Sequence, residues 1–342
     1  MRLLAWCPTP LDGTAYWRVA SPLARLRQQV SDFSFTIVER ADTNDILAHD
    51  VLLLQRPFLD EHVHALETAK ALGRRVWCDW DDDIMDVPAN NGRVFLYRSE
   101  KHQENVRQLA RGADVVTVTC EELRRRFAPH AGARAMIVPN ALDPTLSAGA
   151  ADEDVLPVRQ IAWRGGDSHN EDLDRLGGAF PKVAREAEGR AIWHFVGMTP
   201  YQILNRFPAH SVYVHNWIGD VISYFRFMAR LRPSVLAVPL VDVPFNRKKS
   251  NICCIEAAWM GAVPVAPKWL EGCDLPGVYT YEDDADFERA LREATLAPAD
   301  ELAQRLALLR AAVAKDYGLD AVNMLRMLAL KRALGVVESE AA

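Results

Sequence analysis

The sequence alternates short apolar runs with longer amphipathic segments. Strands that are apolar throughout and alternate with helices are typical of a parallel sheet covered on both faces. Because strand–helix–strand crossovers are right-handed, the first part of the chain predicts a doubly wound α/β domain. The expected strands are Arg2–Trp6, Phe35–Val38, Val51–Leu54, Arg75–Cys78, Val115–Thr119 and Ala135–Val138, with helices at Ala20–Gln29, His62–Leu72 and Glu100–Arg111.

The same alternation restarts after residues 143–158, a small, acidic, proline-bearing segment without periodicity that is typical of a linker. A chain of 342 residues is long enough for two such domains. We expect Rossmann-like domains over residues 1–150 and 151–318 and a helical tail over 319–342. The second set of expected elements is Gln160–Trp163, a helix near Asp172–Ala187, Ala191–Val196, Ser211–His215, a helix near Asp220–Arg230, Ser234–Val238, a helix at Asn251–Met260, and Val263–Ala266.

Composition excludes several classes of protein. There is no run of 18 apolar residues, so we expect no membrane-spanning helix, and the first residues predict a strand rather than a secretory signal. With 40 basic and 46 acidic side chains, the net charge of −6 argues against nucleic-acid binding by bulk electrostatics. The six cysteines form no C-x-x-C pair, which favours reduced thiols and a cytoplasmic location. The adjacent Cys253 and Cys254 are expected to be small buried residues on one helix.

Ligands of doubly wound domains bind at the carboxyl ends of the strands, so the loops that follow strands are the place to look. In the second domain, the stretch 239–264 leads from a strand through Arg247–Asn251 to the start of a helix. Lysines, a hydroxyl and the backbone N–H groups of a helix start make an anion site suited to a diphosphate. Glu256, further along that helix, could accept hydrogen bonds from ribose hydroxyls. The alternative is a solvated basic loop, with Glu256 paired to a neighbour.

A second loop of the same domain, residues 161–173, has Arg164, Gly165 and Gly166 directly after a strand, followed by His169. Paired glycines let a backbone approach a ligand closely, although a simple tight turn also explains them. His169 is either a hydrogen-bond donor to phosphate or sugar, or a residue that caps the following helix.

In the first domain, Tyr16, Trp17 and Arg18 follow the first strand, where Arg18 could meet an anion in the cleft or pack on Trp17 at the surface. A run of aspartates at positions 79, 81, 82 and 83 follows the fourth strand. Such carboxylates suit Mg²⁺ or Mn²⁺, but they repel one another and need cations such as Arg56 nearby. We favour one or two of them bonding loop backbone or a hydroxylated substrate, without a metal.

Taken together, these segments resemble retaining glycosyltransferases of the two-Rossmann GT-B type, specifically the family 4, or group 1, sugar transferases. The resemblance covers most of the chain. It is carried by YWRVASPLARL, DWDDDIMDVP, ADVVTVTCEELRRRF, MIVPNALD, WRGGDSHNEDL and PLVDVPFNRKKSNICCIEAAWMGAVPV.

The resemblance implies a donor domain after residue 150, an acceptor domain before it, and final helices that cross back to the first domain. Many family members have a second glutamate eight positions before the one at Glu256; here Lys248 stands in its place, and Asp242 is a candidate substitute. The implied site has Lys249, Arg164 and Arg18 as catalytic residues, Gly165, Gly166, His169, Lys248, Ser250, Asn251 and Glu256 at the donor, and Tyr16, Trp17, Asp79, Asp82 and Arg56 at the acceptor.

The implied reaction moves a sugar from a nucleotide diphosphate to an acceptor hydroxyl with retention, without a metal or any cofactor besides the donor. The acceptor stays open between a glycan, a lipid-linked glycan, a protein and a hydroxymethylated pyrimidine in DNA, for which the arginines at positions 74, 75, 93, 98 and 124–126 are the local basic candidates. Other hypotheses are a non-catalytic sugar-nucleotide- or glycan-binding protein, a sugar epimerase, and a metal-dependent hydrolase built on residues 79–83.

Overall fold

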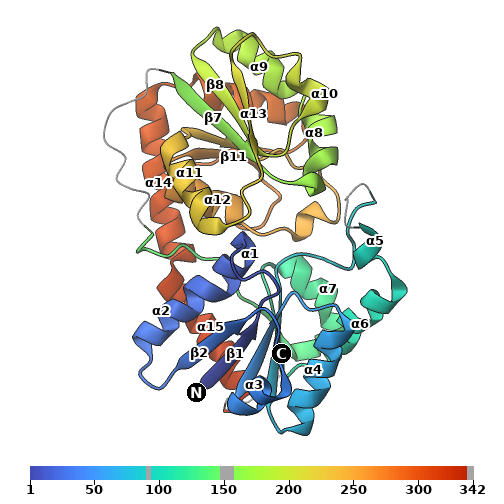
Figure 1. Cartoon of the computed structure of the whole chain (residues 1–342). Coiled ribbons are helices and arrows are strands. Elements are labelled where there is room, and N and C mark those ends of the chain that lie inside the picture. The colour runs from blue at the N-terminus through green and yellow to red at the C-terminus, as the bar shows by residue number, and fades with distance from the viewer. Residues whose placement is uncertain (90–93, 147–157, 337–342) are drawn as a thin grey trace.

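The computed structural model describes residues 1–89, 94–146 and 158–336 and shows two α/β domains, one above the other (Figure 1). Each domain is built on a six-stranded sheet, and all strand pairs within the two sheets are parallel. The expected fold class is therefore confirmed. No helix among the described residues is long and apolar enough to cross a membrane.

The first sheet has the strand order β2-β1-β3-β4-β5-β6. Successive side chains of β1 point to opposite faces, so Leu4 and Trp6 belong to one apolar core and Leu3 and Ala5 to another. Helices α3, α4, α6 and α7 cover the first core, and α2 covers the second. The bounds are β1 Arg2–Trp6, α2 Ser21–Gln29, β2 Ser34–Val38, α3 Thr43–Ala48, β3 Val51–Gln55, α4 Asp60–Ala71, β4 Arg75–Trp80, α6 Glu100–Gly112, β5 Val115–Val118, α7 Glu121–Ala131 and β6 Ala135–Ile137, with short helices α1 Gly13–Ala15 and α5 Val94–Tyr97.

The second sheet has the order β12-β11-β10-β7-β8-β9, which is the arrangement of a dinucleotide-binding domain. Helices α8, α9 and α13 cover one face, and α11, α12 and α14 cover the other. The bounds are β7 Arg159–Arg164, α8 Asn170–Leu176, α9 Ala179–Ala187, β8 Ala191–Gly197, α10 Tyr201–Leu204, β9 Val212–Asn216, α11 Val221–Leu231, β10 Val235–Ala237, α12 Ile252–Met260, β11 Val263–Pro267, β12 Tyr279–Tyr281, α13 Asp284–Leu296 and α14 Ala299–Tyr317.

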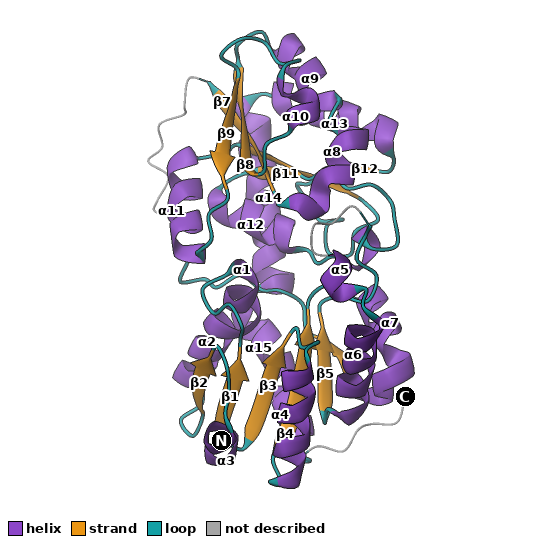
Figure 2. Cartoon of the chain, turned by 45° about the vertical axis from the view of Figure 1, so that its right-hand side comes forward, coloured by secondary structure: helices purple, strands orange, loops and turns teal. Residues whose placement is uncertain are grey.

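The point where strand order reverses lies between β1 and β3 in the first sheet and between β7 and β10 in the second. Ligands of open α/β sheets bind outside the carboxyl ends of strands at such points. Figure 2 shows the strands of the lower domain directed toward the upper one. The fold therefore brings the loops after β1 and β3 to the loops after β7 and β10.

One expected helix is wrong. The segment near Asp172–Ala187 forms two helices, α8 and α9, separated at Gly177 and Gly178. The turn is tight, because a Cβ at Gly177 would lie 2.2 Å from the carbonyl oxygen of Leu173. Most of the expected linker, residues 147–157, lies outside the described residues, so the boundary at residue 150 stays a prediction.

The tail crosses from the second domain to the first, as the resemblance implied. Helix α14 packs against α12, and the chain then pairs with the segment after β6: Leu142 N–H donates to Tyr317 O at 2.8 Å, and Leu319 N–H donates to Leu142 O at 2.9 Å. Helix α15 (Leu319–Ala333) lies on the first sheet, with Leu330 buried in the same core as Leu3. The tail thus supplies part of the first domain's core.

Replacing Leu330 by alanine should destabilise the first domain by about 2–5 kcal/mol, because it removes a fully buried side chain and leaves a cavity. Met324 on the same helix is 74% exposed, so Met324→Ala is the matched control and should change the melting temperature little. Thermal unfolding followed by circular dichroism measures both variants. Equal shifts for the two would contradict the assigned packing of α15.

Candidate functional site

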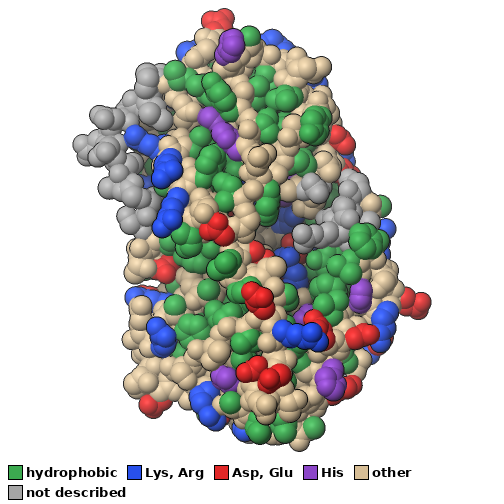
Figure 3. Space-filling view, viewed as in Figure 1, with side chains coloured by type: hydrophobic (Ala, Val, Ile, Leu, Met, Phe, Trp, Pro, Cys, Tyr) green, Lys and Arg blue, Asp and Glu red, His purple; other side chains and the backbone are tan. Residues whose placement is uncertain are grey.

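A cleft of about 670 Å³ lies between the two reversal points. Its walls include Arg18 and Arg56 from the first domain and Arg164, Lys249 and Glu256 from the second. In the space-filling view a hollow separates the two domains, with basic side chains visible inside it (Figure 3). The cleft gathers most of the residues that the sequence assigned to the donor.

Arg164, the last residue of β7, forms the centre of the donor side. Its Nε donates to Glu256 Oε2 at 2.7 Å, and the Tyr224 hydroxyl donates to the same oxygen at 3.1 Å. Burial alone would lower the pKa of Arg164, but the Glu256 charge raises it, so the guanidinium stays positive. Its Nη2 is buried and has no hydrogen-bond partner among the described residues. Arg164 therefore carries a cationic nitrogen that a ligand could engage.

Lys249 supplies the second cation of the donor side. Its ammonium lies 4.8 Å from the centre of the Phe245 ring. Within residues 1–89, 94–146 and 158–336, no carboxylate lies within ion-pair distance of it. Lys249 therefore keeps its charge unpaired at the start of α12, where the helix also presents backbone N–H groups.

The two glycines after β7 have different roles. A Cβ at Gly165 would lie 2.8 Å from atoms of both Trp163 and His169, so this glycine is required by packing against its neighbours. A Cβ at Gly166 would meet only Trp217, at an ordinary 3.6 Å. Of the two, only Gly166 therefore leaves the backbone open toward a ligand as expected from the sequence.

His169 is fixed by a buried carboxylate. Its Nδ1 lies 2.8 Å from Asp172 Oδ2, while Asp172 Oδ1 accepts from the Val241 N–H and the Asn246 amide, each at 2.8 Å. Burial lowers the pKa of His169, which favours the neutral ring. With Nδ1–H donating to Asp172, Nε2 carries the lone pair. His169 is thus suited to accept a hydrogen bond from a sugar hydroxyl, and its side chain does not cap α8.

Arg18 differs from its expected role, because its guanidinium is held by the protein itself. It donates to both oxygens of Asp79, at 3.0 and 2.6 Å, to Val138 O at 2.7 Å and to Asn140 Oδ1 at 3.2 Å. The Asn140 amide donates in turn to the Ser250 hydroxyl at 2.9 Å. Arg18 and Asp79 therefore form a buried ion pair within the first domain, which reaches the second domain through Asn140 and Ser250. Arg18 also lines the cleft.

Lys248 also differs from its expected place at the donor. Its ammonium crosses to the first domain and lies 2.7 Å from Asp83 Oδ2 and 3.1 Å from Asp86 Oδ2. Burial would lower the pKa of Lys248, but these two carboxylates raise it. The residue that stands in place of the family's second glutamate therefore forms an ion pair across the domains, which we call the Lys248 bridge.

Protein cations neutralise the aspartates that follow β4. Arg56 pairs with Asp81 at 2.6 Å and reaches Asp82 at 3.5 Å, and the Arg56 charge holds the pKa of Asp81 low although burial opposes it. Asp83 is shared by Lys248 and Arg126. Among the described residues, the only group of three side chains placed to share a metal ion is made of cysteines. This arrangement favours Arg56 and Asp82 as polar groups of the cleft and gives no support to a hydrolase built on the aspartates.

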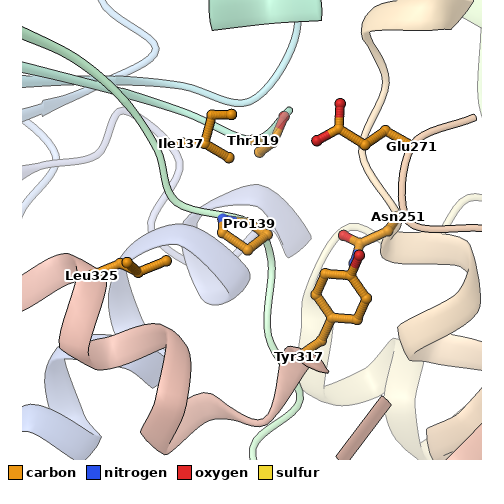
Figure 4. Close-up of a pocket in the computed structure, with 7 residues that line it drawn as sticks. All are labelled: Thr119, Ile137, Pro139, Asn251, Glu271, Tyr317 and Leu325. Carbon is orange, nitrogen blue, oxygen red and sulfur yellow. The ribbon is translucent and has the colours of Figure 1, made fainter. Parts of the chain in front are cut away.

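Three further predicted residues take part in packing or cavities at the contact between the domains. Tyr16 and Trp17 pack edge-on against Phe225 of α11, with ring centres 5.1 and 5.8 Å away, and Trp17 is buried between the domains. Asn251 precedes α12 and lines a separate, smaller cavity of about 280 Å³ together with Glu271 and Tyr317 (Figure 4). Tyr16 and Asn251 therefore lie outside the lining of the main cleft, whereas Trp17 packs at the domain contact and also lines that cleft.

The arginines considered for DNA are bonded within the protein. Arg124 pairs with Glu121, Arg125 with Glu121 and Glu122, and Arg126 with Asp83. Of the others, Arg74 donates to a carbonyl, Arg75 pairs with a carboxylate and Arg98 donates to a carbonyl, while residue 93 lies outside the described part. Each of these arginines within the described residues therefore has at least one hydrogen-bond or ion-pair partner in the protein.

Sequence reasoning missed three residues of the cleft region. Tyr224 shares Glu256 with Arg164, Asp172 fixes His169, and Trp217 lies beside Gly166 with 65% of its surface exposed. Asp172 lies three positions after His169 at the start of a helix, a spacing that could have indicated the pair. Nothing in the sequence places Tyr224 or Trp217 beside residues so far away along the chain.

No protein-family model and no curated protein matches the sequence. Solved structures match the fold. Anabaena Alr3699/HepE, in complex with UDP and glucose, is 13% identical with a TM-score of 0.62, and the match covers 97% of this chain and 99% of that one. A UDP-forming α,α-trehalose-phosphate synthase from Burkholderia xenovorans is 15% identical with a TM-score of 0.61, covering 90% and 76%. An apo structure of OtsA is 13% identical with a TM-score of 0.59, and the match covers 84% of this chain and 75% of that one. The chain therefore has the GT-B fold of these glycosyltransferases.

Asp79→Asn should destabilise the protein by about 3–5 kcal/mol, because it leaves the buried Arg18 charge without its partner. Asp320→Asn breaks the exposed pair between Arg25 and Asp320 and should leave the melting temperature nearly unchanged. Differential scanning calorimetry compares the two variants. A wild-type melting temperature for Asp79→Asn would show that the buried pair does not stabilise the fold.

Lys248→Ala should let the domains separate, because it removes the Lys248 bridge and leaves Asp83 with Arg126 alone. Small-angle scattering should then report a larger radius of gyration for the variant. The neighbouring Arg247 pairs with Asp242 in its own loop, so Arg247→Ala should keep the wild-type value. An unchanged radius for Lys248→Ala would mean that the remaining contacts suffice to hold the domains together.

Proposed function

We propose that this protein is a retaining glycosyltransferase that moves a sugar from a nucleotide diphosphate to an acceptor hydroxyl without a metal. The observation that carries the proposal is the pair of cations on the donor side of the cleft, the unpartnered Nη2 of Arg164 and the unpaired ammonium of Lys249. A diphosphate is the natural partner of two converging cations at a helix start. The positions of these two side chains and their positive charges therefore both support a diphosphate as the ligand.

The remaining donor contacts follow from the geometry around Arg164. Glu256 already accepts from Arg164 and Tyr224 through Oε2, which leaves its Oε1 for the vicinal hydroxyls of a ribose. His169 lines the cleft, and we assign its Nε2 as the acceptor for a sugar hydroxyl. We place the diphosphate between Lys249 and Arg164, beside the open backbone of Gly166.

The proposed chemistry breaks the bond between the sugar's anomeric carbon and a phosphate oxygen. Lys249 and Arg164 stabilise the negative charge that develops on the departing diphosphate, in a site whose donors are already in position. The acceptor oxygen bonds to the anomeric carbon on the same face, and its proton passes to the departing phosphate oxygen. Domain closure around the donor limits hydrolysis by water.

The acceptor lies on the first-domain side, where Arg56 and Asp82 line the cleft. Carboxylates there suit a hydroxylated molecule such as a glycan. A lipid-linked glycan, a protein and a modified DNA base stay open as acceptors. We place the reaction in the cytoplasm, since all six cysteines are unpaired, as in a reducing compartment.

A panel of nucleotide sugars tests the activity, beginning with UDP-sugars because one structural neighbour holds UDP. We expect one donor to be hydrolysed slowly alone and transferred faster when an acceptor is present. Tight binding of a donor with neither hydrolysis nor transfer would contradict the enzyme and favour a sugar-nucleotide-binding protein. Conversion of the donor to its epimer without any acceptor would also overturn the proposal.

Lys249→Ala should lower turnover by about 10²–10³, the usual effect of removing one group that stabilises a developing anion. The melting temperature should stay at the wild-type value, because the ammonium is not in an ion pair within the described residues. Arg247→Ala, two positions away in the same loop, is the control and should keep most of the turnover. Near-normal turnover in Lys249→Ala would place the diphosphate elsewhere.

A further inference from the structure

Three thiols meet beside the donor side of the cleft, and the proposed reaction uses none of them. Cys253 and Cys254 lie in the first turn of α12, and Cys273 lies in the loop after β11. Their sulfur atoms all lie within 4.8 Å of one another, and the Cys253 and Cys273 sulfurs are 3.5 Å apart. A single buried cysteine is readily explained as a small core residue, but three thiols that lie this close together suggest a further role.

Only one of the three sulfur-bearing side chains is reached from the cleft. Cys253 lines its wall, whereas Cys254 and Cys273 have no exposed surface. Hydrogen bonds from the other two thiols, followed by the charge of Arg164, hold the pKa of Cys253 below its usual range. A small oxidant that enters the cleft therefore meets the thiol that ionises most readily and has a second thiol directly behind it.

Geometry selects the partner of Cys253. A disulfide has a sulfur–sulfur bond of about 2.05 Å, so the Cys253 and Cys273 sulfurs need to approach by about 1.5 Å. Cys253 and Cys254 are consecutive helical residues, and their Cα atoms, about 3.8 Å apart, are closer than disulfides usually allow. Cys254 has no surface through which an oxidant could reach it first.

We propose that Cys253 and Cys273 form a reversible disulfide when the protein meets hydrogen peroxide. The Cys253 thiolate attacks one peroxide oxygen, the oxygen–oxygen bond breaks, and a sulfenic acid forms as hydroxide leaves and takes up a proton to become water. The Cys273 sulfur then attacks the Cys253 sulfur and expels the hydroxyl group as a second water. Both sulfurs are oxidised by one electron each, and one hydrogen peroxide is reduced to two waters.

The loop that carries Cys273 contacts three parts of the molecule: the first domain, the start of α12 and the end of α14. Glu271 accepts a hydrogen bond from the Glu121 N–H of the first domain at 2.7 Å. Gly272 has a φ of +75°, and a Cβ there would lie 2.7 Å from both Asn251 Cβ and the Tyr317 hydroxyl. The loop is therefore held between the start of α12, the crossing tail and the first domain.

A cavity of about 280 Å³ lies beside this loop and is lined by Glu271. Figure 4 shows Asn251, Glu271 and Tyr317 around that space. The Asn251 amide is buried with neither its nitrogen nor its oxygen bonded within the described residues. Because Asn251 contacts Gly272 and directly precedes α12, we expect a shift of the loop toward Cys253 to displace the start of the helix that carries Glu256.

Intact mass and peptide mapping test the disulfide on the purified full chain. The protein is treated with hydrogen peroxide and quenched, its remaining thiols are alkylated in denaturant, and the digest is mapped with and without dithiothreitol. We expect the loss of two hydrogens, a Cys253–Cys273 cross-linked peptide, and full reversal by dithiothreitol. A different pairing, or six alkylated thiols after oxidation, would overturn the proposal.

Variants separate this pair from the neighbouring thiol. Cys273→Ser and Cys273→Ala should stop at a sulfenic acid on Cys253 that dimedone traps, while Cys254→Ser should still form the cross-link. Both Cys273 variants are used, with melting temperatures, so that one poorly folded protein does not decide the result. Loss of the cross-link in a folded Cys254→Ser protein would overturn the proposal, as would a thiophilic metal ion retained by all three sulfurs in native mass spectrometry.

The consequence for activity rests on the proposed function, whereas the covalent readout does not. Displacing the start of α12 by about 1 Å should lower sugar transfer by about a hundredfold, and dithiothreitol should restore it. A cross-link that forms with unchanged transfer would refute the regulatory effect but leave the disulfide standing. Absence of transfer in the reduced protein would instead refute the proposed function.

Discussion

The buried ion pair between Arg18 and Asp79 holds the segment of the first domain through which several contacts to the rest of the molecule are made. Its guanidinium holds both Asp79 oxygens, the carbonyl of Val138 and the side chain of Asn140. It thereby fixes the segment after β6, which carries both the hydrogen bond to Ser250 and the pairing of Leu142 with the crossing tail. A charge removed from water needs this complete set of partners, so the segment has little freedom to adopt another position.

The other contacts between the domains build on that fixed segment. The Lys248 bridge joins the loop before α12 to the loop after β4, and Tyr16 and Trp17 pack on Phe225 of α11. These contacts connect the loops after β1 and β4 to the second domain. Lys248, Tyr16 and Trp17, which the sequence assigned to substrate binding, therefore also make contacts between the two domains.

The alternation of apolar runs and helices predicted the fold because parallel strands buried on both faces have few other arrangements. The loops after β7 and before α12 also predicted where Arg164, Lys249 and Glu256 gather, since carboxyl ends of parallel strands meet at one edge. Pairing across long sequence distances was not predictable. Whether Arg18 or Lys248 faces a ligand or a carboxylate depends on Asp79 and Asp83, which only the folded chain brings near, and the Gly177 break depends on one carbonyl contact.

The two walls of the cleft differ in charge, although the net charge of the whole chain is −6. On the first-domain side, Arg18 and Arg56 are both bonded to aspartates, so that wall offers neutralised pairs and carboxylate oxygens. On the second-domain side, Glu256 occupies only part of Arg164, and Lys249 has no carboxylate partner in the described chain. This asymmetry supports the proposal that the second domain holds the anionic leaving group and that a neutral hydroxylated acceptor binds against the first. The Cys253 thiol lies beside the same cationic wall, so its pKa depends in part on the Arg164 charge that we assign to the donor site.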